Sequence, residues 1–170
     1  LSGAAFAYVT GIDLIVIPTP NTSHYPLARA ALAAGKHVVV DKPFTVTLDE
    51  ARQLNHAAQA AGRVLSVFQN RRWDGDFLTL QQVIASGELG RIVHFESHFD
   101  RYRPALRNRW REQNIPGSGL WYDLGAHLVD QTLQLFGAPD SISLDTAAQR
   151  AGSEVCDWFH AALRYGQNRC

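Results

Sequence analysis

The residue whose position most suggests chemistry is Lys42. It follows the apolar run that ends at Val40, with only Asp41 between, and precedes Pro43, which favours an extended backbone at the lysine. If the run is a strand of a parallel sheet, Lys42 lies at the carboxyl edge, where open α/β sheets bind their ligands. Most loop lysines are simply solvated, so this position alone leaves a binding role and a solvated role both open.

A second candidate is the pair Asp123 and His127, four positions apart in a predicted helix and therefore on one helix face. A carboxylate that orients an imidazole leaves the other ring nitrogen to abstract a proton. An aspartate near a helix start beside an unrelated histidine would look the same. Three nearby glycines favour the functional reading, because they cost helix stability and let the backbone bend or approach a ligand: Gly117, Gly119 and Gly125.

Two further polar groups follow in the middle of the chain. His94, Glu96 and His98 share one face of a predicted strand, but alternating polar residues also typify the wet face of an antiparallel sheet, and we predict no metal site. The next stretch could form a polar pocket or a nucleic-acid surface. It contains Arg101, Arg103, Arg107, Arg109 and Arg111, interleaved with Tyr102 and Trp110. Equal numbers of basic and acidic residues, 16 each, favour the pocket.

The first seventy residues predict part of a parallel sheet with helices on its faces. We expect strands at 14–17, 37–40 and 64–68, which are short and rich in β-branched residues. Thr22 or Ser23 is expected to cap a helix that ends near Ala34, with Gly35 behind it. Thr47 and Glu50 predict a capping box for a second helix that stops at Gly62. Such alternation is typical of right-handed βαβ units.

The pattern changes after Asn70 and predicts a second, α+β domain. We expect helices at 74–86 and 120–136, an alternating strand at 92–101, and further strands at 141–147 and 157–165. The segment from Arg103 to Gly119 is expected to be a loop. The fold class predicted is therefore α/β, with an open, mostly antiparallel sheet in the second domain.

Composition narrows the class of partner. The formal net charge is zero, which gives no field to attract nucleic acid or an anionic membrane, so we expect a small-molecule partner. The longest apolar run, Leu14 to Ile17, is too short to span a bilayer. Cys156 and Cys170 form no CxxC pattern, and a reducing compartment is the default. We expect a cytoplasmic protein.

Three motifs, in this order and spacing, make the sequence resemble the Gfo/Idh/MocA oxidoreductases. They are Thr19-Pro20-Asn21-Thr22-Ser23-His24, then Ala34-Gly35-Lys36-His37-Val38 leading into Asp41-Lys42-Pro43, and Gly119-x-x-x-Asp123-x-Gly125-x-His127. Asp41 replaces the glutamate that is more usual in the Glu-Lys-Pro motif. Within the family, residues 70–74, 101–104 and 109–112 look most like NADP-dependent scyllo-inositol dehydrogenases and their bacterial relatives.

The resemblance implies a partial Rossmann dinucleotide-binding domain at 1–70 and a partial α+β substrate and oligomerisation domain at 71–170. No G-x-G-x-x-G occurs in the chain, so the first strands and the glycine-rich turn are expected before Leu1. The last strands are expected after Cys170. We therefore expect an internal fragment of a homodimer or homotetramer, with weak or no dinucleotide binding and no activity by itself.

The resemblance also implies roles for individual residues in hydride transfer between NADP or NAD, with NADP favoured, and a secondary alcohol of a sugar or cyclic polyol. The catalytic residues would be Lys42, Asp123 and His127. Cofactor contacts would come from Pro18, Thr19, Asn21, His24, Asp41, Lys42, Asn70 and Arg72, and substrate contacts from Arg103, Arg109, Trp110 and Tyr122. Two alternatives stay open: a non-catalytic sensor or interaction module of the same fold, and a metal-dependent hydrolase or isomerase using His94, Glu96 and His98.

Overall fold

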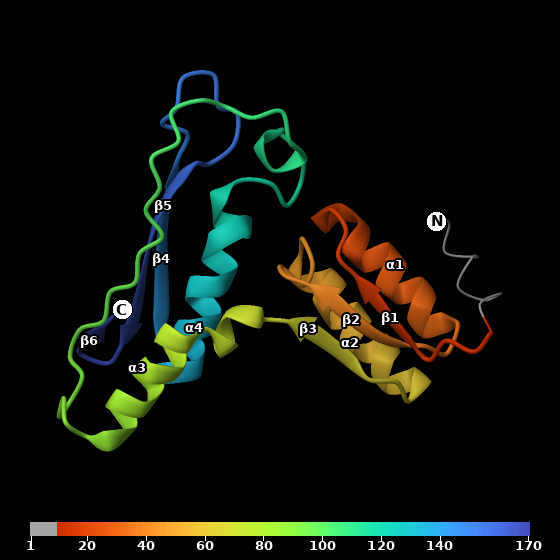
Figure 1. The fold of residues 1–170 in the computed structure, drawn as a ribbon, viewed down its shortest axis with the longest axis horizontal. Coiled ribbons are helices and arrows are strands. Elements are labelled where there is room, and N and C mark those ends of the chain that lie inside the picture. The colour runs from red at the N-terminus through yellow and green to blue at the C-terminus, as the bar shows by residue number, and fades with distance from the viewer. Residues whose placement is uncertain (1–9) are drawn as a thin grey trace. The chain divides into compact units, whose positions relative to one another are not determined.

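The computed structural model describes residues 10–170, which divide into two units (Figure 1). The first unit runs to Phe68 and also includes Ile115–Gly117. The second contains Gln69–Asn114 and Ser118–Cys170. The first domain expected from the sequence, 1–70, includes residues 1–9, which lie outside the described residues.

The first unit is built on a parallel sheet with strand order β1-β2-β3. Ile17 of β1 pairs with Val40 of β2, and Val40 in turn pairs with Val67 of β3. The predicted strand–helix alternation is confirmed, and the elements are β1 (Leu14–Ile17), α1 (Asn21–Ala33), β2 (His37–Asp41), α2 (Leu48–Ala61) and β3 (Leu65–Phe68).

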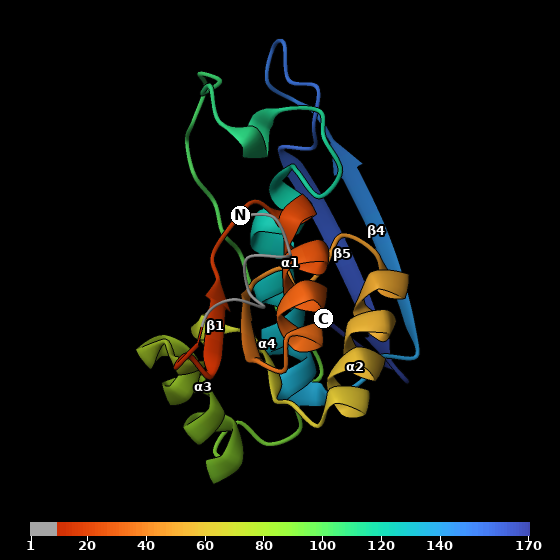
Figure 2. The same cartoon turned by 90° about the vertical axis from the view of Figure 1, so that its right-hand side faces the viewer.

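Both helices of this unit cover the same face of the sheet. Strands that pair in sequence order, joined by right-handed crossovers, put each connecting helix on one side, and α1 packs against both α2 and β2. Figure 2 shows the two helices next to each other. The core between helices and sheet holds Ile17, Leu32 and Leu54. Leu14 and Val16 keep 49% and 60% of their surface exposed, so the described residues leave the other face of β1 uncovered.

The helix ends test the local predictions. Thr47 and Glu50 form the expected capping box at the start of α2, and Gly62 ends that helix with φ 60°. The expected cap of α1 at Thr22 or Ser23 is wrong, because the helix begins earlier, after Pro20. Proline fixes its own φ near the helical value, and the carbonyl of Pro20 accepts from the backbone nitrogen of Ser23 at 2.9 Å, which closes the first turn.

The second unit combines helices with an antiparallel sheet of order β4-β5-β6, which confirms the α+β prediction. Phe159 of the sheet packs edge-on against Trp121 at 5.2 Å between ring centroids. No helix in the described part of the chain is long and apolar enough to cross a membrane. The elements are η2 (Asn70–Trp73), α3 (Gly75–Ser86), η3 (Trp110–Glu112), η4 (Trp121–Gly125), α4 (Ala126–Phe136), β4 (Ser141–Ala147), β5 (Trp158–Tyr165) and β6 (Asn168–Arg169).

The strand predicted at 92–101 is not formed; the segment holds only an isolated β-bridge at His94. An alternating sequence becomes a strand only when a neighbouring strand completes its hydrogen-bond ladder. Among the described residues, β5 already lies between β4 and β6. Aromatic contacts hold the segment instead, since Phe95 packs on Phe136 with ring centroids 5.5 Å apart.

The helix predicted at 120–136 has two parts. Residues Trp121–Gly125 form the π-helical turn η4, and the α-helix α4 continues from Ala126 to Phe136. Gly125 is buried where a Cβ atom would overlap the ring of Trp121, so the turn requires glycine at this position. Single π-helical turns within helices are rare and frequently occur at functional sites.

Candidate active site

Lys42 lies at the carboxyl edge of the first sheet, where the sequence predicted it. β1 and β2 run parallel and end at Ile17 and Asp41, so the residues after both strands gather at one edge. Pro18 and Thr19 follow β1, and Lys42 follows β2. The backbone nitrogen of Lys42 donates to Oδ1 of Asp41 at 2.8 Å. This hydrogen bond fixes the backbone from which the lysine side chain extends.

His24 connects the two turns at this edge. Its ring has no exposed surface, and Nε2 lies 2.8 Å from the carbonyl oxygen of Thr19 while Nδ1 lies 2.9 Å from that of Pro43. Carbonyl oxygens only accept, so the ring donates in these contacts, and which nitrogen does so depends on the tautomer. Both nitrogens face the backbone, and His24 thereby holds the turn after β1 against the segment that carries Lys42.

Asn21, at the start of α1, is also turned to the backbone. It is 5% exposed, and its Nδ2 donates to the carbonyl oxygen of Gly117 at 2.7 Å. Gly117 has φ +78°, and a Cβ atom there would lie 2.8 Å from a methyl carbon of Val46. Glycine is therefore required at position 117, where residues 115–117 pack on the rest of the first unit.

Asp123 and His127 lie in the second unit, at the junction of η4 and α4. Oδ1 of Asp123 is 3.4 Å from Nε of Arg111, whose guanidinium lies 4.4 Å above the ring of Trp110. His127 is 5% exposed, in the first turn of α4. The junction thus joins a carboxylate with a cationic neighbour to a buried imidazole. Tyr122 belongs to η4 as well.

Backbone contacts hold the start of this junction closely against Cys156. The backbone nitrogen of Leu120 donates to the carbonyl oxygen of Cys156 at 2.7 Å. The backbone nitrogen of Gly119 donates to the carbonyl oxygen of Arg111 at 2.9 Å. A Cβ atom on Gly119, whose φ is +87°, would lie 2.9 Å from Sγ of Cys156. The glycines predicted a backbone that bends or approaches a ligand, and at Gly119 the close approach is to another segment of the protein.

We expect Gly119→Ala to destabilise the protein by roughly 2–4 kcal/mol, because the new methyl group meets Cys156 and the backbone is left-handed. The matched control is Gly87→Ala, since Gly87 has φ +77° but no atom within 4 Å of the place that a Cβ atom would occupy. That control should cost only about 1 kcal/mol. Urea unfolding measures both, and equal losses in the two variants would contradict a close approach at Gly119.

Sequence reasoning missed a buried ion network behind Arg109. Glu112 accepts from Nε of Arg109 at 2.8 Å and lies 3.5 Å from Nη1 of Arg150. Arg150 also donates through Nε to Asp157 at 2.8 Å. The side chains of Glu112 and Asp157 are only 6% and 7% exposed. The network ties the loop before α4 to the loop between β4 and β5. Only the Arg109–Glu112 spacing of three could have signalled it.

The network determines the charge state of its two carboxylates. Burial by itself would raise the pKa of Glu112, but hydrogen bonds from the backbone of Arg107 and from Arg109, with the charge of Arg150, outweigh it and lower the pKa. The pKa of Asp157 is likewise lowered, against its burial, by hydrogen bonds from the Gln149 backbone and from Arg150. Both groups therefore stay ionised at neutral pH.

These lowered pKa values predict a loss of stability in acid. Carboxylates whose pKa falls on folding stabilise the protein above their unfolded pKa, and this contribution disappears as pH falls through the folded value. The free energy of unfolding should therefore decrease as pH falls below roughly 4. Urea unfolding at several pH values measures it. Glu112→Gln should flatten the acid dependence and cost roughly 2–3 kcal/mol at pH 7.

The control for that experiment is Glu88→Gln, because Glu88 is exposed and lies outside the network. It should leave both the stability at pH 7 and the acid dependence as in the wild type. An acid dependence that is equally steep in Glu112→Gln and in the wild type would show that the network does not link folding to pH.

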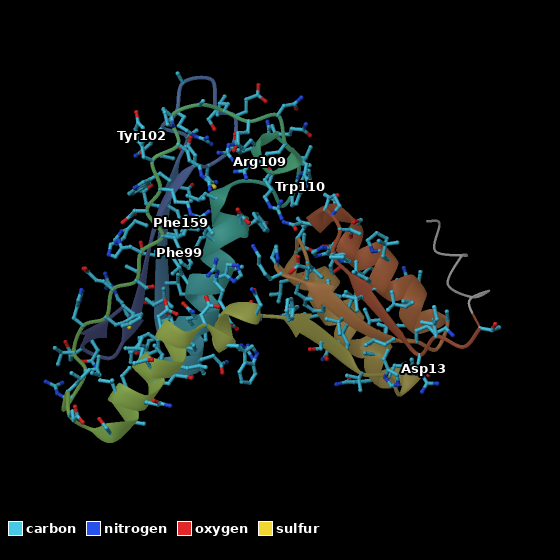
Figure 3. The ribbon with its side chains drawn as sticks, in the orientation of Figure 1. Asp13, Phe99, Tyr102, Arg109, Trp110 and Phe159 are labelled. Atoms are coloured by element: carbon cyan, nitrogen blue, oxygen red, sulfur yellow. The ribbon has the colours of Figure 1, made fainter. Side chains whose placement is uncertain are left out.

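The second unit also contains an open cavity of about 890 Å³. Arg103, Arg109 and Asp123 belong to its polar lining, and Phe99 and Phe159 to its apolar lining. Figure 3 labels Arg109 and both phenylalanines. Two of the four substrate residues expected from the resemblance, Arg103 and Arg109, thus line the same cavity as Asp123.

Positive charge accumulates near Arg103. Its pKa is lowered, first by partial desolvation and then by repulsion from Arg101, Arg107 and Arg109, while Asp123 acts in the opposite direction. A guanidinium remains charged despite such a shift. This stretch therefore carries positive charge that the neighbouring carboxylates do not fully neutralise.

The remaining candidates of the second unit are at η2 and in residues 94–98, and the latter also line the cavity. Asn70 is exposed at the start of η2, and Arg72 pairs with Asp130 of α4 at 2.6 Å. Nε2 of His94 is 2.9 Å from Oε1 of Glu96, whose pKa is lowered first by that hydrogen bond. No group of three or more His, Cys, Asp or Glu side chains among residues 10–170 is arranged to hold a metal ion.

Comparison with known families agrees with this two-part organisation. Residues 5–69 match the model described as oxidoreductase family, NAD-binding Rossmann fold, and residues 77–170 match the GFO/IDH/MocA C-terminal domain. The chain therefore has the two-part fold of an oxidoreductase with a nicotinamide-binding Rossmann part. It belongs to the Gfo/Idh/MocA family.

Individual relatives match at high identity. The uncharacterized oxidoreductase YdgJ of Escherichia coli is 64% identical over 158 residues, which are 93% of this chain and 46% of that protein. The scyllo-inositol 2-dehydrogenase (NADP(+)) IolW of Bacillus subtilis is 45% identical over 92% of this chain and 44% of its own length. A solved Yersinia pestis structure shares 60% identity with a TM-score of 0.90, covering 98% of this chain and 47% of its own. The chain spans about half the length of the relatives it matches.

Proposed function

We propose that this chain belongs to an enzyme that transfers a hydride between a nicotinamide dinucleotide and a secondary alcohol of a cyclic polyol or sugar. The observation that carries the proposal is the position of Lys42, directly after β2 at the carboxyl edge of a parallel sheet, within a chain of this family. NADP and an inositol-like substrate are proposed because IolW, 45% identical, is named as acting on scyllo-inositol with NADP(+).

The groups at this edge fit the nicotinamide and ribose end of such a cofactor. An ammonium at Lys42 donates to hydroxyl and carbonyl oxygens, and the carboxylate of Asp41 accepts from hydroxyls. Pro18 and Thr19 provide the adjacent backbone. His24 and Asn21, whose ring and amide nitrogens bond the backbone, shape this surface from behind. The bound cofactor supplies the carbon that accepts or returns the hydride.

Side chains of the protein take up and return the proton of the substrate hydroxyl. In the oxidation direction, His127 takes the proton of the substrate hydroxyl. A hydride leaves the carbon that bears this hydroxyl, so the alcohol becomes a carbonyl. Asp123 orients the imidazole, and Arg111 in turn holds Asp123. Lys42 donates to the reacting oxygen and steadies the negative charge that develops there. Arg103 and Arg109, with Trp110 and Tyr122 nearby in the sequence, are proposed to contact the rest of the substrate.

A cofactor and substrate survey of the full-length protein tests this proposal. NADPH and NADH are titrated separately by fluorescence, and scyllo-inositol, other inositols and common sugars are then offered with each oxidised nucleotide while absorbance is followed at 340 nm. We expect NADPH to bind more tightly than NADH and at least one cyclic polyol to be oxidised. Nucleotide binding without turnover of any alcohol would favour a non-catalytic sensor of the same fold.

A further inference from the structure

Arg72 makes a two-point contact with Asp130 of α4. Its Nε donates to Oδ2 at 2.8 Å and its Nη2 donates to Oδ1 at 2.6 Å. This geometry matches the planar guanidinium to the carboxylate and is among the strongest side-chain pairings in proteins. The side chain of Asp130 is only 12% exposed, against 40% for Arg72. Both bonds hold the guanidinium of Arg72 against α4.

A second bond joins the same two elements. Nε2 of Gln131 donates to the carbonyl oxygen of Arg71 at 3.0 Å. Arg71 is itself held, because its guanidinium bonds Asp74 at 2.8 Å and lies 5.0 Å over the ring of Phe99. The turn η2 is therefore a fixed support, and α4 is attached to it at two successive residues. Figure 1 shows η2 beside α4.

The residues held in this way share a helix face with His127. Asp130 and Gln131 follow His127 by three and four positions, which places all three on one side of α4. The helix on the other side of His127 is the π-helical turn η4, an irregular segment that depends on its tertiary contacts. The position of the imidazole therefore depends on how α4 is held at Asp130.

We propose that Arg72 is a positioning residue for His127, acting through Asp130, and that it does not bind the cofactor. This inference rests on the proposed role of His127 as general base. It replaces the cofactor contact that the resemblance implied for Arg72. The reason for an effect on rate is geometric: displacing a catalytic group by about 1 Å can slow a reaction by roughly 100-fold.

The test is a double-mutant cycle in the full-length protein with Arg72→Met, Asp130→Asn and their combination. We expect each single variant to lower kcat by roughly 10- to 100-fold while the Kd of NADPH changes less than about twofold. The double variant should be no slower than the worse single variant, because both remove one interaction. Arg72→Lys should recover part of the rate, since lysine keeps the charge but not the two-point geometry.

The control is Arg29→Met, which removes an exposed guanidinium from α1 and should change neither kcat nor the Kd of NADPH. Two results would overturn the proposal. In one, Arg72→Met raises the Kd of NADPH at least tenfold while Asp130→Asn leaves it unchanged, which would make Arg72 a cofactor ligand. In the other, both variants lower only the melting temperature and leave kcat intact, which would make the pair purely structural.

A spectroscopic measurement separates this proposal from the proposed function. If the wild-type protein turns over no alcohol, the function fails, and the ring resonances of His127 then report its position directly. They are assigned by their loss in His127→Gln. Both Arg72→Met and Asp130→Asn should shift them in the same direction, and unchanged resonances in the two variants would overturn the positioning role.

Discussion

Lys42→Ala is expected to lower kcat by roughly 100- to 10,000-fold while the protein stays folded. The proposed role of the ammonium is to donate to the oxygen on which negative charge develops, and such donors act mainly on the transition state. The side chain belongs to a loop residue and is only partly buried. Its removal should therefore change the free energy of unfolding by less than about 1 kcal/mol. Initial rates at 340 nm and a thermal melt measure the two quantities.

The chain provides an unusually direct control, because it has only two lysines and they flank the same strand. Lys36 precedes β2 and Lys42 follows it, so Lys36→Ala removes an equal charge from the amino end, away from the edge proposed to bind the cofactor. That variant should keep its rate. Lys42→Arg should stay slow, since a planar guanidinium does not replace a compact ammonium. Turnover within threefold of wild type in Lys42→Ala would refute the assignment.

The second large effect is expected for His127→Gln, which should lower kcat by roughly 100- to 10,000-fold because glutamine cannot take up a proton from the alcohol. The affinity for NADPH should change little. Because His127 is 5% exposed, some loss of stability is also expected, and the thermal melt must be measured with the kinetics. Glutamine is chosen because it is polar and close in size to histidine.

The matched control is His56→Gln, on the exposed side of α2, which should leave the rate unchanged. The group that takes the hydroxyl proton during alcohol oxidation must return it as a general acid when the carbonyl product is reduced, so the loss should be similar in both directions. A rate loss in His127→Gln that disappears when the protein is stabilised by excess NADPH would indicate unfolding, and the role as general base would then be withdrawn.

The sequence predicted well wherever the signal is local. Thr47 and Glu50 form their capping box three residues apart, and Gly35 and Gly62 follow their helices with left-handed φ of 71° and 60°. The order of strands and helices in the first unit also followed from patterns within a few residues. Such features depend on neighbouring atoms along the chain, so their residue types are sufficient to predict them.

Predictions failed where the outcome depends on distant partners. Residues 92–101 alternate as a strand should, yet among the described residues they find no ladder to join. Arg72 and Asp130 meet across 58 positions, and neither residue signals the other in the sequence. The π-helical turn η4 was missed for a similar reason, because it depends on tertiary contacts such as that of Trp121 with Phe159. The resemblance supplied the candidate residues, but their hydrogen-bond partners required the structure.

The bond from Asn21 to Gly117 has a consequence for how the protein is made. It spans 96 positions, and residues 115–117 belong to the first unit although the chain between them and β3 belongs to the second. During synthesis the strands β1, β2 and β3 can pair as soon as they emerge, because each joins a neighbour close in sequence. The last contacts of the first unit must wait until Gly117 has left the ribosome, so its completion and the folding of the second unit overlap in time.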